Sequence, residues 1–125
     1  MAKATKATTP VTMDFEVAED RSCELDDYTV NFVTIRQSHD LAPMLAVLPD
    51  GLCHCPHWGV VTKGRITVTY PDRDEVYETG DAFYMTPGHV PAALAGSEFV
   101  QFSPTAELNV THAHMQAVAM AMKSS

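Results

Sequence analysis

The chain has 125 residues and a mass of 13.7 kDa, the size of one domain. Sixteen acidic and eight basic residues give a net charge of −8. This charge argues against nucleic acid, whose phosphates need clustered lysine and arginine, and against docking on anionic lipid. No apolar run approaches the ~20 residues of a membrane span, and the N-terminal lysines are not followed by the apolar core of a signal peptide. We therefore expect a cytoplasmic protein.

Residues 1–10 are small and polar, so we expect a disordered N-terminal tail before a single domain over residues 11–125. Short apolar or alternating segments separated by turn residues then predict a series of strands. The predicted strands cover residues 11–17, 28–35, 45–48, 53–62, 65–70, 75–77, 82–86, 92–95 and 98–102. Short strands at such intervals are typical of an all-β sandwich or barrel. Only residues 106–122 show helical spacing without Gly or Pro, which predicts one C-terminal helix.

The stretch GLCHCPHWG, residues 51–59, holds the first candidates for chemistry. Alternate residues of a strand share a face, so Cys53, Cys55 and His57 are expected on one side. Thiolates and imidazoles in such a cluster suit a soft or borderline metal. His54 belongs to the opposite face unless Pro56 introduces a bulge, so a role for His54 in place of a proposed ligand stays open.

A second region, GDAFYMTPGHVP over residues 80–91, reads as turn, strand and tight turn. The Pro87-Gly88 pair favours a turn that projects His89 from a rigid corner. Together the two regions offer four metal ligands, Cys53, Cys55, His57 and His89. On the strand before the turn, Tyr84 is a candidate to point into the barrel and contact a bound small molecule.

Each candidate also has a structural interpretation. The cysteines could be small buried apolar residues, and the histidines could be hydrogen-bonded groups of the core or of the turn. Residues 58–61 are apolar on both faces, as expected of a strand covered on both sides, so Trp58 and Val60 are expected in the core or in a subunit interface. Three cysteines, an odd number, do not suit a secreted disulfide framework.

Residues 51–104 resemble the conserved core of the cupin superfamily. The similarity is carried by HWGVVTKGRITVTY from His57, GDAFYMTPGH from Gly80 and EFVQFSP from Glu98, with Gly51 and Gly64 bracketing the first cupin motif. The resemblance implies a cupin-type double-stranded β-helix, a jelly-roll barrel, with one C-terminal helix. It also implies pairing of barrels, and together with the apolar outer residues and the helix it leads us to expect a homodimer.

The chain departs from the usual cupin metal site of three histidines and one glutamate. Counting from Gly64, His57 stands where the motif carries its glutamate, and Cys53 stands at the second histidine position. In the second motif the histidine position is taken by Pro91, while His89 directly follows the glycine. The remaining set of two thiols and two imidazoles suits zinc best, with iron or copper as alternatives.

Three hypotheses for the function follow. The first is a metal-dependent enzyme acting on a small molecule, with lyase, isomerase and dioxygenase chemistry all compatible with the cupin resemblance. The second is a non-catalytic cupin that binds or senses a metal or small ligand, favoured if all four ligands close the coordination shell. The third is a barrel without metal, in which the cysteines pack or undergo redox chemistry.

Overall fold

The computed structural model describes residues 3–14, 16–40, 54–110 and 113. Within these residues the chain forms ten strands and one short helical segment. The strands are β1 (Val11–Asp14), β2 (Ala18–Leu25), β3 (Tyr28–Ile35), β4 (His39–Asp40), β5 (His57–Lys63), β6 (Arg65–Thr69), β7 (Asp74–Glu78), β8 (Ala82–Met85), β9 (Val90–Ala93) and β10 (Glu98–Pro104).

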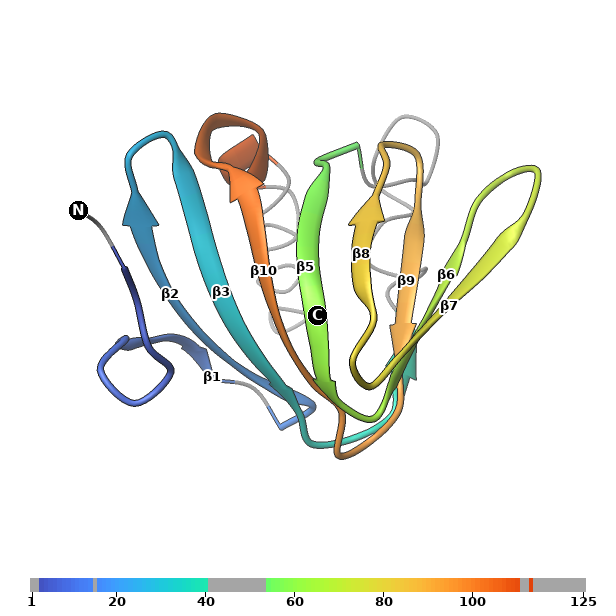
Figure 1. Ribbon diagram of the computed structural model, residues 1–125, viewed down its shortest axis with the longest axis horizontal. Coiled ribbons are helices and arrows are strands. Elements are labelled where there is room, and N and C mark those ends of the chain that lie inside the picture. Colours follow the sequence, from blue (N-terminus) through green and yellow to red (C-terminus); the bar gives the residue numbers. More distant parts are fainter. Residues whose placement is uncertain (1–2, 15, 41–53, 111–112, 114–125) are drawn as a thin grey trace, which may run out of the picture.

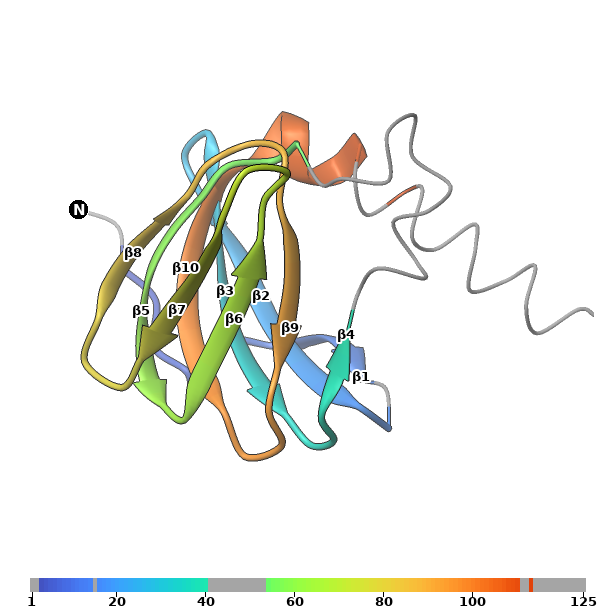
Figure 2. The same cartoon turned by 90° about the vertical axis from the view of Figure 1, so that its right-hand side faces the viewer.

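The strands build two antiparallel sheets. The larger sheet has the order β1-β2-β3-β10-β5-β8 and the smaller has the order β4-β9-β6-β7. Figure 1 looks onto the larger sheet, and Figure 2 shows the smaller sheet as a second layer across from it. The chain crosses between the sheets several times, so the layers share one interior. The predicted all-β jelly roll is therefore confirmed.

Most strands lie where the alternation of apolar residues predicts them, and β3 covers the predicted residues 28–35. Two strands were not predicted. The β2 sequence AEDRSCEL lacks regular apolar alternation, and its residues form a strand because each pairs with β3. β4 has only two residues, paired with β9. The strand predicted over residues 45–48 lies outside the described residues.

The core fills the space between the sheets with side chains from β5, β6, β7, β8 and the residue that follows β6. Its buried members are Val61, Ile66, Val68, Tyr70, Tyr77, Phe83 and Met85, with Phe99 packed against them. The rings of Tyr77 and Phe83 stack with centroids 4.9 Å apart, and Phe83 also lies over Gly59. A Cβ at Gly59 would lie 2.2 Å from the carbonyl oxygen of Val100, so glycine lets β5 and β10 approach closely.

The helical segment, residues 105–110, follows β10 without a linker. It is tied to the barrel by Leu108, which is 4% exposed, and by a 2.8 Å hydrogen bond between the hydroxyls of Thr105 and Thr29. A C-terminal helix is thus confirmed at its beginning, while most of the predicted helix lies outside the described residues. In the described part of the chain, no helix has the length and apolar character needed to cross a membrane.

A polar pair is buried between β2 and β3. The amide nitrogen of Asn31 donates to both carboxylate oxygens of Asp20, at 3.0 and 3.1 Å. Asn31 is 1% exposed, and its Oδ1 has no hydrogen-bond partner among the described residues. Burial raises the pKa of Asp20 above its ordinary value, while the Asn31 hydrogen bond opposes this shift. The charged carboxylate is therefore a local cost to the folded state.

We expect Asp20→Asn to stabilise the fold at pH 7 by about 1–2 kcal/mol, because the new amide can donate to the unsatisfied Asn31 Oδ1 and carries no charge. Part of this gain comes from removing the charge of Asp20, whose pKa is raised in the folded protein. That part is largest at pH values above the raised pKa, and it disappears as the pH falls toward 3.8, where the carboxyl group becomes protonated in both states. Urea denaturation at several pH values measures it. Asp74→Asn, at an exposed position of β7, controls for the change in net charge. Equal effects of both substitutions would contradict the interpretation.

Candidate functional site

Two of the predicted ligands, His57 and His89, meet inside one end of the barrel. His57 is the first residue of β5, and His89 directly precedes β9. Their ring centroids lie 5.2 Å apart, and the rings are tilted by 57°. The side chains are 7% and 0% exposed, respectively. The fold therefore brings together two imidazoles that are 32 positions apart in the chain, shielded from solvent.

The inward orientation of His57 follows from the strand register. His57 pairs with Met85 of β8, and the next pair, Trp58 with Tyr84, faces the other side of the sheet. The Nδ1 atom of His57 lies 2.5 Å from the hydroxyl oxygen of Ser103, a buried residue of β10. This hydrogen bond engages Nδ1 and fixes the ring plane of His57.

His89 is held by the turn that precedes it. Gly88 has a φ of +92°, a left-handed conformation that glycine adopts without strain. The Nδ1–H of His89 donates to the carbonyl oxygen of Thr86 at 2.5 Å. This bond assigns the proton to Nδ1, so Nε2 carries a lone pair, and Nε2 is buried without a hydrogen-bond partner among the described residues. A buried acceptor of this kind costs the folded state roughly 1–3 kcal/mol.

The electrostatics keep His89 neutral. Burial lowers the pKa of His89 below its ordinary value of 6.5, the hydrogen bond to Thr86 acts in the opposite direction, and the nearby His54 lowers the pKa further. A neutral imidazole is the form that binds a metal. The geometry and the pKa therefore favour the same state of this ring.

Tyr70 contacts the His89 turn through a hydrogen bond to its backbone and through its ring. The backbone N–H of Thr86 donates to the Tyr70 hydroxyl at 3.0 Å, and the Tyr70 ring meets the His89 ring edge-on with centroids 6.4 Å apart. The same Thr86 thus receives support through its N–H and orients His89 through its carbonyl. Outer hydrogen bonds of this kind fix the direction of ligating imidazoles in metal sites.

The predicted one-face cluster of Cys53, Cys55 and His57 lies partly outside the described residues, because these do not include Cys53. β5 begins at His57, so residues 54–56 precede the strand and strand alternation does not apply to them. Cys55 is buried and its thiol lies 3.6 Å from the Pro56 carbonyl oxygen, His54 is exposed, and Cys53 lies outside the described residues. Across residues 54–110 and the other described ranges, no three His, Cys, Asp or Glu side chains converge to hold a metal ion.

Tyr84 does not face the barrel interior, which corrects the sequence-based expectation. Tyr84 pairs with Trp58, and both side chains lie on the outer face of the larger sheet. Their rings stack with centroids 4.8 Å apart, and Tyr84 is 47% exposed. Trp58 and Val60 are also exposed within this chain, so they do not belong to its core, and the alternative of a subunit interface stays a prediction.

Three supporting residues were missed in the sequence. Ser103 lies one residue beyond the predicted strand 98–102, and only the longer β10 of the structure places it at a buried position. Thr86 acts through its backbone, which no residue type reveals. Tyr70 looks like an ordinary apolar strand residue, and only the packing of β6 against the His89 turn gives its hydroxyl a role.

The comparisons with known proteins identify the fold. No protein-family model and no curated protein matches the sequence. A solved structure of unknown function from Rhizobium leguminosarum is 16% identical, with a TM-score of 0.60 over 82% of this chain and 94% of that chain. An RmlC-like cupin from Shewanella frigidimarina is 13% identical, with a TM-score of 0.56 over 81% and 88%. The FeII form of HppE is 9% identical, with a TM-score of 0.57 over 82% and 60%.

We expect His89 of the metal-free protein to show the Nδ1–H tautomer and to be mostly neutral at pH 6.5, where an ordinary imidazole is half protonated. Because the pKa of His89 is lower in the folded protein than in the unfolded chain, protonation of this ring favours unfolding. The free energy of unfolding should therefore decrease as the pH falls below 6.5. Long-range proton–nitrogen NMR measures tautomer and charge, and the spectrum of His89→Gln assigns the signals. A His89 ring at least half protonated at pH 6.5 would contradict the assignment.

Proposed function

We propose that this chain, which has the cupin fold, binds one divalent transition metal inside the barrel and acts with it on a small molecule. The described ligands of the proposed site are His57 and His89. The observation that carries the proposal is the buried lone pair of His89 Nε2, which has no hydrogen-bond partner among the described residues and lies in a pair of imidazoles with centroids 5.2 Å apart.

The hydrogen bonds around the two rings support a metal more than a purely structural role. Each Nδ1 is engaged, in His57 by the Ser103 hydroxyl and in His89 by the Thr86 carbonyl. Ligating histidines in proteins characteristically use one ring nitrogen for such a partner and the other for the metal. A structural histidine buried as deeply as His89 would be expected to satisfy both ring nitrogens, whereas His89 Nε2 has no hydrogen-bond partner among the described residues.

Further ligands are proposed from the sequence. Cys55 lies two residues before His57 and is buried, and Cys53 remains a candidate outside the described residues. A site of two imidazoles with one or two thiolates favours zinc, with iron or copper as alternatives. We place the protein in the cytoplasm, where reducing conditions would keep both thiols available as ligands.

A metal at this position would polarise a carbonyl or lower the pKa of a bound water. The chain's own contribution is to hold two imidazoles in fixed directions and to shield them from bulk water. An enzyme needs an open coordination position, whereas a closed shell indicates binding or sensing without catalysis. The complete burial of His89 favours this second candidate, a non-catalytic metal-binding cupin.

We expect the purified, untagged protein to bind close to one equivalent of zinc, and His57→Ala or His89→Ala to weaken zinc binding at least about 100-fold. The basis is that loss of a mere supporting partner typically weakens metal binding 10–100-fold, so loss of a ligand should cost more. Competition with a chromophoric chelator measures the affinity, and elemental analysis measures the content.

His54→Ala is the matched control, since His54 is an exposed histidine close to the pair. We expect it to retain the zinc affinity, and a loss as large as that of His57→Ala would instead place His54 in the ligand set. Circular dichroism shows whether each variant is folded. Unchanged zinc binding in both folded ligand variants, or less than about a tenth of an equivalent in the wild type, would overturn the metal site.

Cobalt substitution separates the enzyme from the binding protein. In the enzyme, added azide should reach an open position and change the visible cobalt spectrum. A spectrum that azide leaves unchanged, in a protein that still binds cobalt through His57 and His89, would favour the non-catalytic candidate and reject the enzyme.

A further inference from the structure

A second buried polar side chain, apart from the histidine pair, has an atom without a partner. Asn31 of β3 is 1% exposed, and its Oδ1 has no hydrogen-bond partner among the described residues. In this part of the chain, only His89 Nε2 shares that property among buried side-chain nitrogen and oxygen atoms. Both atoms are acceptors, so each suits a bound group that brings a donor or a positive charge. The proposed metal would serve His89 and leaves Asn31 unexplained.

The strand register places Asn31 on the inner face of the larger sheet. Asn31 pairs with Gln101 of β10. Ser103, two residues farther along β10, contacts the inward ring of His57. Residues two apart on a strand share a face, so Asn31 points between the sheets, as Ser103 does. The strands β3, β10 and β5 run side by side in Figure 1. With about 4.8 Å between strands and about 3.4 Å per residue, the Cα atoms of Asn31 and His57 lie about 12 Å apart.

The direction of the free oxygen follows from its neighbour, Asp20 of β2. Asp20 pairs with Val33, two residues from Asn31, so its side chain lies on the same inner face. Asn31 Nδ2 lies 3.0 and 3.1 Å from the two carboxylate oxygens of Asp20. An ionised carboxylate only accepts hydrogen bonds, so the amide turns its nitrogen toward Asp20 and its oxygen away. A carboxylate and a carboxamide oxygen, both acceptors, are therefore neighbours here.

The charge of Asp20 is not balanced by a cation of the described residues. Glu19, the preceding residue on the opposite face of β2, forms ion pairs with Arg21 and Arg36. Asp20 belongs to none of the ion pairs in the described part of the chain, and its carboxylate accepts from Asn31 instead. Burial raises the pKa of Asp20, which shows that its charged form is disfavoured. A positive charge bound beside Asp20 would remove this cost.

Solvent reaches the inner face beside Asn31. Phe99 and Gln101 point between the sheets from β10, yet both keep an intermediate exposure. Asp20 on β2 is partly exposed as well. Ser103, nearer the histidine pair on the same face, is fully buried. A small polar group can therefore approach the two acceptors from the space between the sheets.

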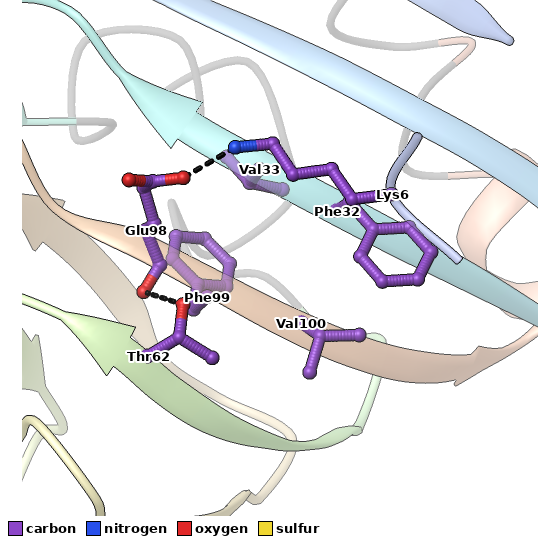
Figure 3. A pocket seen from close by; sticks show the side chains of 7 residues that line it. All are labelled: Lys6, Phe32, Val33, Thr62, Glu98, Phe99 and Val100. Carbon is purple, nitrogen blue, oxygen red and sulfur yellow. Dashed lines mark hydrogen bonds and ion pairs between the residues drawn. The ribbon is translucent and has the colours of Figure 1, made fainter. Parts of the chain in front are cut away.

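The hollow on the outer side of the same strands is a different feature. It has a volume of about 200 Å³ and is lined by Phe32 and Val100 among others, as Figure 3 shows. Phe32 directly follows Asn31, so its side chain points to the other face of the sheet. Lys6 and Glu98 at this hollow form an ion pair with one another. The charges of the outer hollow are thus balanced within the chain, whereas the charge on the inner face is not.

We propose that Asp20 and Asn31 form a subsite for a primary ammonium group of the bound small molecule. One N–H would donate to Asn31 Oδ1 and another to the Asp20 carboxylate, whose charge the ammonium would balance. A hydroxyl group has one hydrogen to donate and brings no charge, so it fits the two acceptors less well. The inference rests on the proposed function in that it names the chemical class of its small molecule, an amine. The subsite itself needs no metal.

The test uses propylammonium as the probe and the chelator-treated, metal-free protein. We expect the side-chain amide signal of Asn31 in proton–nitrogen NMR spectra to shift saturably, with a dissociation constant on the order of 1 mM for so small a ligand. The spectrum of Asn31→Leu assigns the signal by its loss. Tetramethylammonium carries the same charge but has no N–H group, and we expect it to leave the signal unchanged.

Asp20→Asn is the variant that removes the subsite without weakening the fold. Its amide would supply the donor that Asn31 Oδ1 lacks and would remove the charge, so propylammonium binding should weaken at least tenfold. Asp74→Asn, at an exposed position of β7, makes the same change in net charge and should bind as the wild type does. Thermal unfolding shows that both variants are folded. The comparison of the two cations is made on the wild type and depends on no variant.

An Asn31 signal that propylammonium leaves unchanged up to about 100 mM, far above the expected dissociation constant, would overturn the proposal. Equal shifts from propylammonium and tetramethylammonium would also overturn it, because they would reduce the effect to attraction by the net charge of −8. Equal binding by the wild type and the folded Asp20→Asn would do the same.

Zinc binding is read separately. We expect Asp20→Asn to keep the zinc content and zinc affinity of the wild type, since Asp20 is not a ligand of the proposed metal site. A protein that binds propylammonium through Asp20 but takes up no zinc would support the subsite and overturn the metal function. The two proposals therefore fail separately.

Discussion

The structure depends on the antiparallel register that joins β10, β5 and β8. This pairing decides which side chains of β5 face the interior and which face outward, because alternate residues of a strand point to opposite sides. His57 points inward and Trp58 outward. A register slip of one residue would bury Trp58 and expose His57. The close approach at Gly59, where no side chain fits, holds this alignment at the centre of the sheet.

The inner face buries several polar groups, and each of them needs a hydrogen-bond partner to avoid a cost to the folded state. His57 and Ser103 satisfy one another across two strands, and the His89 turn is supported through Thr86 by Tyr70. The unsatisfied Nε2 of His89 stands out against this background, because nearly all other buried side-chain nitrogen and oxygen atoms in the described residues have partners. A metal bound at the proposed site would offset the cost of burying that lone pair.

The outer face carries apolar side chains that remain exposed to solvent. Its aromatic row of Phe102, Trp58 and Tyr84 spans three strands and adds little to the core of a single chain, since its members remain substantially exposed. An exposed apolar cluster of this size is within the range of the largest patch on a monomeric protein, and such patches are often functional. The same strand, β5, therefore presents His57 of the proposed metal site to the interior and the exposed apolar residues Trp58 and Val60 to the exterior. Strand alternation alone separates the two faces.

The sequence by itself determined the all-β class and most of the strands, and it singled out His57 and His89, which the fold brings close together, because period-two apolar alternation and the Pro-Gly turn act locally. It did not determine β2, which forms only by pairing with β3, or the orientation of Tyr84. Parity along one strand is ambiguous until the register with its neighbour is known. Hydrogen bonds to strands distant in the chain likewise decide where β5 begins. The start of β5 in turn decides which residues near it alternate between the two faces.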